Sequence, residues 1–231
     1  MTIIISEIGV NWNANYELLE EMVVKSKKIG CNLVKFQSID ATKLQHPKKE
    51  IIMNSSVSED NVEKINQICE NAEIEWFCTP MYFEAVEFLD PYVKRFKVRE
   101  YDGRDLLENK SNSIIEKILE TGKEVIISSN KSPKKSKFFQ NKKIKWLYCV
   151  PKYPCKLEEI NFQNISEFNG YSNHCVETIA PITAVALGSD IVEIHLTSDK
   201  SGDFIDNNVS LDYNDFQETV KQIRLLDRIK R

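Results

Sequence analysis

Residues 190–197 read DIVEIHLT, a run rich in β-branched residues that carries Glu193 and His195 within it. Runs of this kind, in which apolar residues are nearly continuous, are typical of strands buried on both faces of a sheet. Seven other segments of the chain have the same character. Together the eight predicted strands cover residues 3–10, 32–37, 74–79, 94–99, 124–129, 144–150, 168–173 and 190–197.

Segments with a helical spacing of apolar residues separate and follow these strands. They cover residues 15–29, 59–72, 81–89, 112–121, 133–139, 157–166, 177–188 and 212–230. Alternation of strand and helix predicts a parallel sheet, because each parallel return requires a crossover. Eight such units in 231 residues predict one α/β domain, a TIM (β/α)8 barrel over residues 1–231. An open doubly wound sheet is the alternative, but neither GxGxxG nor GxxxxGK[ST] is present.

The composition excludes several classes of protein. Hydrophobic residues make up 42% of the chain, enough for a continuous core. The formal net charge is only -4, so no overall basic field would attract nucleic acid or an anionic membrane. The N-terminus lacks a signal-peptide pattern, and no apolar run approaches the ~20 residues that span a bilayer. With six cysteines and no CxxC, we expect a cytoplasmic protein with reduced thiols and a small-molecule partner.

Polar side chains recur where the predicted strands end. In a barrel of parallel strands these ends form the active-site face, and charged groups inside apolar strands are costly unless paired or ligand-bound. The set comprises Glu7, Lys35, Gln37, Lys97, Arg99, Glu100, Ser128, Ser129, Asn130, Tyr153, Ser172, Asn173, His174, Glu193 and His195. Because these residues converge on one face, they predict a functional site rather than side chains that serve only the fold.

Two of the three histidines, His174 and His195, end neighbouring predicted strands. Neutral imidazoles suit a divalent transition metal, and two protein ligands leave coordination positions open for water and substrate. A lone histidine is more often a core or surface residue, and His46, in a polar loop, is predicted to lie on the surface. The adjacent pair favours a metal site.

Two lysines and two serines at the strand ends predict an anion site. A phosphate or carboxylate is best held by cations together with hydroxyl donors. The alternative is that each lysine pairs with a carboxylate inside the barrel, such as Glu7 or Glu193. The four residues of the predicted anion site are Lys35, Lys97, Ser128 and Ser172.

At these residues and in the segments around them, the chain resembles the N-terminal barrel of the N-acetylneuraminate (sialic acid) synthase family. The similar segments occur in family order and span nearly the whole chain. They are 6-SEIGVNWN-13, 34-VKFQS-38, 76-WFCTPMYFEAVEFL-89, 96-FKV-98, 121-TGKEVIISS-129, 149-CVPKYPCKLEEINF-162, 170-GYSNH-174, 185-VALGSDIVEIHLT-197 and 206-DNNVSL-211. The resemblance implies a carbon–carbon bond-forming transferase that condenses phosphoenolpyruvate with an N-acyl hexosamine to a nonulosonic acid, using Mn or Mg.

The resemblance also implies roles for individual residues. The metal ligands are matched by His174 and His195. The contacts to phosphoenolpyruvate are matched by Lys35, Lys97, Ser128 and Ser172. Positions near the amino sugar or the metal water are matched by Gln37, Tyr153 and Asp206, and a sugar-contacting glutamate is replaced by Asp102. The expected catalytic residues are Glu7, Asp206 and Tyr153, where the glutamate could act as an acid, a base or an anchor for water.

Several departures from the family pattern bear on activity. Residues 99–102 replace a Gly-Ser-Gly-Glu stretch whose serine binds phosphate, so Glu100 would repel phosphate unless Arg99 neutralises it. Pro151 replaces a phosphate-contacting asparagine, and Asn173 replaces an aspartate beside the metal site. Two alternatives to a synthase therefore stay open. One is a non-catalytic paralogue that binds a ligand or a full-length synthase, and the other is a metal-dependent barrel enzyme of altered chemistry.

The family's barrel is usually followed by an antifreeze-like domain. The present chain stops at Arg231, soon after the last predicted helix, so we expect no such domain here. The resemblance further implies a homodimer, because family barrels pair partly through that domain.

Overall fold

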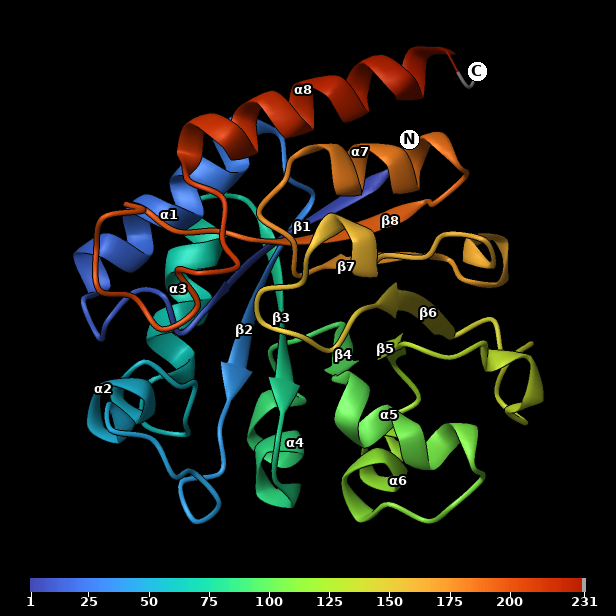
Figure 1. The fold of residues 1–231 in the computed structure, drawn as a ribbon. Coiled ribbons are helices and arrows are strands. Elements are labelled where there is room, and N and C mark those ends of the chain that lie inside the picture. Colours follow the sequence, from blue (N-terminus) through green and yellow to red (C-terminus); the bar gives the residue numbers. More distant parts are fainter. Residues whose placement is uncertain (230–231) are drawn as a thin grey trace.

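The eight strands close into a single barrel, which confirms the predicted fold class (Figure 1). The structure is a computed structural model that describes residues 1–229. Every strand runs parallel to its two neighbours, and pairing of the first strand with the last completes the ring. The strands are β1 (Ile3–Gly9), β2 (Leu33–Ser38), β3 (Glu75–Pro80), β4 (Arg95–Val98), β5 (Glu124–Ser129), β6 (Ile144–Cys149), β7 (Gly170–Asn173) and β8 (Ile191–His195).

Most of the predicted helices are present around the barrel (Figure 1). Six of them correspond to α1 (Tyr16–Ile29), α3 (Val62–Asn71), α4 (Phe83–Leu89), α6 (Ser113–Glu120), α7 (Ile179–Ala186) and α8 (Tyr213–Ile229). In α1, the Asn15 side chain accepts hydrogen bonds from two first-turn amides and Gly30 ends the helix in a left-handed conformation, so local sequence fixes both ends. Residue 230, the predicted end of the last helix, lies outside the described residues.

Two predicted helices are wrong. Residues 133–139 form only a 3-10 turn at Pro133–Lys135, where consecutive lysines of like charge follow a proline. Residues 157–166 form two such turns, Leu157–Glu159 and Ile165–Glu167, with irregular chain between them. There Phe162 packs edge-on against two tyrosines of the barrel, at ring distances of 5.9 and 5.1 Å. Tertiary contacts thus override the apolar spacing of that segment.

Two further helices, α2 (Lys49–Asn54) and α5 (Glu100–Leu107), were not predicted. The sequence of α5, EYDGRDLL, has only two aliphatic residues, so its apolar periodicity is weak. The helix follows β4 directly and packs closely on β5, because a Cβ at Gly103 would lie 2.9 Å from Ile127 Cγ2 and 3.0 Å from the Ser128 carbonyl oxygen. This close approach places the start of α5 at the mouth of the barrel.

A network of hydrogen bonds joins α8 to the start of the chain, at the barrel end away from the strand C-termini. The Asp227 carboxylate accepts from the Thr2 amide at 2.9 Å and from the Thr2 hydroxyl at 2.8 Å. The Arg224 guanidinium donates to the Thr2 and Gly30 carbonyl oxygens at 2.6 and 2.8 Å. The last helix is therefore fastened to β1 and to the end of α1 by buried or half-buried polar groups.

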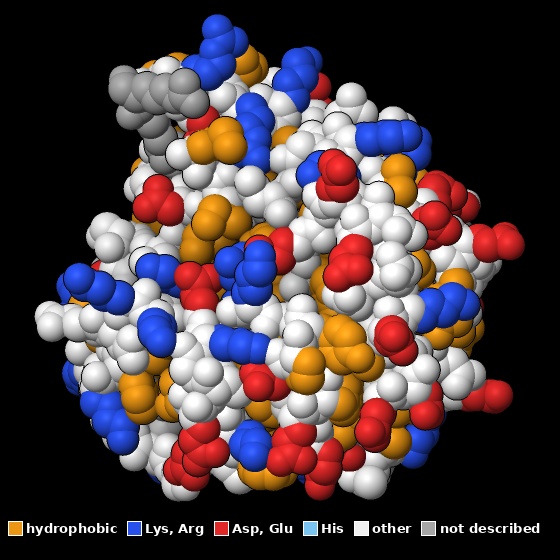
Figure 2. All heavy atoms as spheres, turned by 180° about the vertical axis from the view of Figure 1, so that it is seen from behind, with side chains coloured by type: hydrophobic (Ala, Val, Ile, Leu, Met, Phe, Trp, Pro, Cys, Tyr) orange, Lys and Arg blue, Asp and Glu red, His pale blue; other side chains and the backbone are white. Residues whose placement is uncertain are grey.

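The outside of the barrel carries charges of both signs. On the face shown in Figure 2, Lys and Arg side chains alternate with Asp and Glu side chains, in keeping with the near balance of charge in the sequence. The six cysteines are buried thiols, as expected from their spacing. Among residues 1–229, no helix is long and apolar enough to cross a membrane.

Candidate active site

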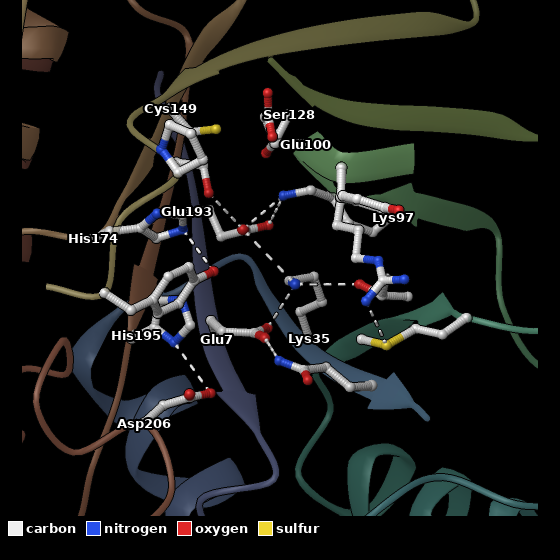
Figure 3. A pocket seen from close by; sticks show the side chains of 18 of the residues that line it. Glu7, Lys35, Lys97, Glu100, Ser128, Cys149, His174, Glu193, His195 and Asp206 are labelled. Carbon is white, nitrogen blue, oxygen red and sulfur yellow. Dashed lines mark hydrogen bonds and ion pairs between the residues drawn. The ribbon is translucent and has the colours of Figure 1, made fainter. Parts of the chain in front are cut away.

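A cavity of about 410 Å³ opens at the C-terminal ends of the strands, and each of the eight strands contributes a side chain to it (Figure 3). Ten of the eleven residues expected in the site line this cavity, and Asp102 is the exception. The ten are Glu7, Lys35, Gln37, Lys97, Ser128, Tyr153, Ser172, His174, His195 and Asp206. Side chains from strands up to 190 residues apart thus meet at one mouth, as barrel geometry requires.

Glu193 is the centre of the charged cluster in this cavity. Lys97 Nζ lies 2.6 Å from both of its carboxylate oxygens, and the Ser172 hydroxyl donates to Oε1 at 2.8 Å. Lys35 Nζ is 3.7 Å from the same oxygen. Because three strands point cations or a hydroxyl at one buried carboxylate, attraction to the lysines outweighs burial and lowers the pKa of Glu193.

A second carboxylate, Glu7, shares Lys35 with the first. Glu7 Oε2 lies 3.0 Å from Lys35 Nζ, and Glu7 Oε1 accepts from Gln37 Nε2 at 2.8 Å. Burial raises the pKa of Glu7 to about 7 in spite of Lys35, and the negative charge of Glu193 adds to the increase. Glu7 can therefore exchange a proton near neutrality, which an ordinary carboxylate cannot do.

The two lysines differ in how well their charges are balanced. Burial would lower the pKa of Lys35, but the two neighbouring carboxylates outweigh it and raise that pKa. Burial lowers the pKa of Lys97, against the attraction of Glu193. Both lysines thus pair with barrel carboxylates, the alternative that the sequence left open for each. The pairing does not remove the cluster from the cavity, which both lysines still line.

The His174 imidazole is held by two hydrogen bonds. Nδ1 lies 2.7 Å from the Val150 carbonyl oxygen, and Nε2 lies 2.9 Å from the Tyr153 hydroxyl. Burial lowers the pKa of His174 to about 4 and raises the pKa of Tyr153 well above its usual range. At neutral pH the ring therefore donates from Nδ1 to the carbonyl and accepts the tyrosine proton at Nε2.

His195 stands beside this ring, with 5.6 Å between the ring centroids. Its Nδ1 is buried without a hydrogen-bond partner among the described residues and lies 3.8 Å from Asp206 Oδ2. Burial, followed by the neighbouring His174, lowers the pKa of His195 well below its usual range, so the ring is neutral. Burial also raises the pKa of Asp206 to about 6. A free imidazole nitrogen and a carboxylate are both ligand types that divalent cations take, so His195 and Asp206 are residues of this cavity that could hold one.

Gly9 allows the groups around this donor set to approach one another. Its φ of +56° lies in the left-handed region, which side chains rarely adopt. A Cβ at this position would lie 3.0 Å from Gln37 Nε2, 3.1 Å from Glu7 Oε1 and 3.6 Å from Asp206 Oδ2. A side chain here would therefore separate the first-strand glutamate from its partners.

Ser128 lies on the opposite side of the cavity from the imidazoles, next to Glu100 (Figure 3). Its hydroxyl is buried and has no hydrogen-bond partner in residues 1–229 other than the Cys149 thiol, a weak one. The serine is thus available to a ligand that enters the cavity.

Glu100 is paired with an arginine, but this arginine is not Arg99, the neighbour that the sequence analysis considered. Its partner is Arg104, one helical turn further along α5, whose Nε and Nη2 donate to the carboxylate at 2.9 and 2.7 Å. Arg99 pairs instead with Asp102, whose side chain does not line the cavity. The condition that the sequence analysis set, a neighbouring positive charge on Glu100, is met by Arg104 because the α-helical conformation of α5 places residues four apart side by side.

Some cavity residues were missed in the sequence. Thr79 accepts a hydrogen bond from Lys35 at 3.3 Å, and Arg104 and Tyr101 lie at the rim. Thr79 could have been found as a polar residue at the end of a predicted strand. Arg104 and Tyr101 could not, since their place depends on α5, for which the sequence gave no clear periodicity.

The fold and the site together define a class of protein. Buried, mutually paired lysines and glutamates lie beside two neutral imidazoles at the C-terminal ends of parallel strands, which is where TIM-barrel enzymes have their active sites. Comparison with known proteins places the chain more closely: the model of the NeuB family matches residues 22–230, and the chain belongs to that family.

Relatives of the chain are known from several organisms. An uncharacterized protein of Methanocaldococcus jannaschii is 31% identical over 247 residues, which cover 99% of this chain and 72% of that protein. A pseudaminic acid synthase of Campylobacter jejuni is 28% identical, with coverage of 96% and 72%, and the human N-acetylneuraminate-9-phosphate synthase is 27% identical, with coverage of 97% and 70%. The family thus includes synthases of sialic-acid-type sugars.

Solved structures confirm the fold. A sialic acid synthetase from Leptospira borgpetersenii, solved with citrate, superposes with a TM-score of 0.85 at 22% identity, covering 99% of this chain and 85% of that one. A truncated 3-deoxy-D-arabino-heptulosonate 7-phosphate synthase from Thermotoga maritima superposes with a TM-score of 0.71 at 14% identity, covering 100% and 87%. At these identities the likeness extends to the barrel architecture alone.

Proposed function

We propose that this protein condenses phosphoenolpyruvate with an N-acylated amino sugar to form a sialic-acid-like nonulosonic acid, with the help of a divalent metal. One observation carries the proposal: the lysine cluster around Glu193 and the imidazole pair share a single cavity. The reaction needs an anion-binding region and a carbonyl-activating region side by side, because an anionic donor must meet an aldehyde. Membership of the NeuB family supports the same reaction class.

The donor would bind at the lysine side of the cavity. We assign Lys35, Lys97 and the hydroxyls of Ser128 and Ser172 to its carboxylate and phosphate groups, since these combine cations with hydroxyl donors. Glu193, which now holds Lys97 and Ser172, keeps these groups oriented before the donor enters. Orientation of this kind lowers the entropic part of the barrier.

The metal would bind at the imidazole side. His174 and His195 present neutral rings, the second has an unpartnered buried nitrogen, and the Asp206 carboxylate lies 3.8 Å from that nitrogen. These residues fit a divalent ion with two protein nitrogens, although residues 1–229 hold no group of three or more His, Cys, Asp and Glu arranged around one point. Mn²⁺ or Mg²⁺ held there would polarise the sugar aldehyde as a Lewis acid.

The remaining residues handle the sugar and the protons. In the proposed reaction, C3 of phosphoenolpyruvate bonds to the aldehyde carbon, water adds to C2, and inorganic phosphate leaves. Glu7, with a pKa of about 7, can accept a proton from that water and pass it to the oxygen of the former aldehyde, which becomes a hydroxyl. Gln37 and Tyr153 line the cavity near Glu7 and His174, where we place the acceptor sugar. The sugar contact expected of Asp102 is not retained, because its side chain does not line the cavity.

The proposal is tested by phosphate release. Purified protein with phosphoenolpyruvate, a panel of N-acyl hexosamines and Mn²⁺ should release inorganic phosphate and yield a nonulosonic acid detectable by mass spectrometry. Chelation with EDTA should abolish the release, and added Mn²⁺ or Mg²⁺ should restore it. Absence of release from folded, metal-loaded protein across the panel would contradict the proposal.

A ligand-binding role without catalysis is the second candidate. It is favoured by two features that oppose binding of a dianion. Lys35 and Lys97 are already paired with carboxylates, and Glu100 adds a negative charge to the cavity wall. This candidate predicts no turnover, together with a stable complex with a full-length synthase. Calorimetric titration with phosphoenolpyruvate distinguishes the two candidates.

A further inference from the structure

The four cations of the cavity differ sharply in accessibility. The side chains of Lys35 and Lys97 are 6% and 3% exposed, and each forms an ion pair with a buried carboxylate. The side chains of Arg99 and Arg104, on α5 and at its start, are 43% and 50% exposed and also line the cavity. An anion that approaches from solvent therefore meets the two arginines before it reaches the lysines.

Both arginines keep hydrogen-bond donors free. Arg104 contacts Glu100 through Nε and Nη2 only, and no described residue accepts a hydrogen bond from its Nη1. Arg99 contacts Asp102 through Nε and Met81 Sδ through Nη1, so its Nη2 is unused in the described part of the chain. A guanidinium has five N–H donors, and the carboxylates that hold these two groups use only one side of each.

The ion pairs at the rim do not fasten α5 to the barrel. Arg99 pairs with a residue three positions away and Arg104 with one four positions away, so both pairs are local to the helix. Local, half-exposed pairs contribute little to stability. The Tyr101 ring, 69% exposed, lies 5.6 and 5.7 Å from the two guanidinium groups and keeps them on the same side of the helix. The arrangement orients the arginines more than it stabilises the fold.

Below this rim lies the one buried hydroxyl of the predicted anion site that stays available. Ser128 is 4% exposed and lines the cavity, and among residues 1–229 its only hydrogen-bonding neighbour is the Cys149 thiol. By contrast, Ser172 already donates to Glu193. A tetrahedral oxyanion between the rim and the floor would find guanidinium N–H groups on one side and this hydroxyl on the other.

We propose that Arg104 and Arg99, with the Ser128 hydroxyl, form a subsite for a phosphate monoester at the rim of the cavity. Dianionic phosphate monoesters favour such groups, because a planar guanidinium can donate two parallel hydrogen bonds to phosphate oxygens. Glu100 and Asp102 act here as positioning residues that hold the guanidinium planes. The inference rests on the proposed function in that at least one substrate carries a phosphate.

Equilibrium binding tests the subsite without turnover. Isothermal titration of the full chain with inorganic phosphate should show binding that Arg104→Gln weakens about tenfold and Arg99→Gln weakens severalfold. Arg104→Lys should also weaken it, because lysine keeps the charge but not the paired donors. Arg228→Gln, on the exposed end of α8, is the matched control that removes one positive charge away from the cavity and should bind as the wild type does.

The same variants identify which substrate supplies the phosphate. Titration with phosphoenolpyruvate and with an N-acetylhexosamine 6-phosphate should show the Arg104 dependence for one of them, and the unphosphorylated sugar should show none. Thermal melting checks that each variant is folded. Wild-type protein that binds no phosphate, or arginine variants that bind it like Arg228→Gln, would overturn the subsite. Phosphate binding is measured without turnover. If the proposed function is wrong but the subsite is right, the protein forms no product and still binds phosphate, so the two failures can be told apart.

Discussion

The Tyr153 hydroxyl lies 2.9 Å from Nε2 of His174 and donates its proton to that nitrogen. The other ring nitrogen is bonded to the Val150 carbonyl oxygen, so Nε2 carries the lone pair that a metal ion would use. A metal ion at Nε2 would compete with the tyrosine for this lone pair, and the tyrosine would have to turn aside. Tyr153 would then set how tightly such an ion is held.

Replacing that tyrosine should strengthen metal binding. Tyr153→Phe removes the competing hydroxyl, and a neutral hydrogen bond contributes about 1 kcal/mol, so Mn²⁺ affinity should rise about fivefold. Titration followed by the electron paramagnetic resonance of free Mn²⁺ measures it. Tyr101→Phe is the control, since that ring lines the same cavity without contacting an imidazole. Equal affinities for Tyr153→Phe and wild type would mean that the hydroxyl does not compete.

Loss of His195 should abolish metal binding while sparing the fold. The Nδ1 atom of His195 makes no hydrogen bond within residues 1–229, so His195→Leu sacrifices none at that nitrogen and replaces the ring by a side chain of similar volume. We expect Mn²⁺ affinity to fall by about a hundredfold or more, because loss of a mere hydrogen-bond partner of a metal ligand already costs about 10- to 100-fold. The melting temperature should change by only a few degrees. Retained tight Mn²⁺ binding in the folded variant would exclude His195 as a ligand.

Removal of the Glu193 charge should destabilise the barrel. Glu193→Gln leaves two buried lysines without their shared counter-charge, which typically costs about 3 to 5 kcal/mol. Urea denaturation measures the free energy of unfolding. The control Glu75→Gln breaks pairs with Lys94 and Arg95 at the partly exposed start of β3 and should cost less than about 1 kcal/mol. Similar losses for the two variants would show that the buried cluster is no more costly to break than a surface pair.

Asp227 should make stability depend on acid pH. Burial alone would raise its pKa, but hydrogen bonds from Thr2 and Arg224 outweigh burial and hold the pKa below its usual range. The carboxylate thus stabilises the fold fully at neutral pH, and this contribution is lost as pH falls below about 4 and through the lowered folded-state pKa. Asp227→Asn should cost about 1 to 3 kcal/mol at pH 7.

The same variant should lose this difference in acid. Urea denaturation at pH 7, 4 and 3 should show the stabilities of wild type and Asp227→Asn converging as pH falls, since the wild-type carboxyl becomes protonated. A gap that stays constant from pH 7 to pH 3 would show that this carboxylate is not the source of the pH dependence.

The barrel could be predicted because its signal is local and repeated. Each strand is a short apolar run and most helices have a helical spacing of apolar residues. The alternation of strands and helices can therefore be recognised without knowledge of tertiary contacts. The prediction failed where packing decides: α5 forms although its sequence has few apolar residues, because Gly103 fits closely against β5. Residues 157–166 have apolar spacing but stay irregular, since Phe162 packs on barrel tyrosines.

By itself, the sequence determined the parallel barrel and the polar residues at its mouth, because the apolar run of a strand and the polar residues at its end are encoded in neighbouring positions. Only the tertiary structure decided which of these residues pair. Glu193 meets Lys97 across 96 positions of chain, and Glu100 pairs with Arg104 rather than with its neighbour Arg99. The physical reason is that the choice of partner depends on distances of a few ångströms between side chains, which exist only once the barrel has closed and α5 has docked.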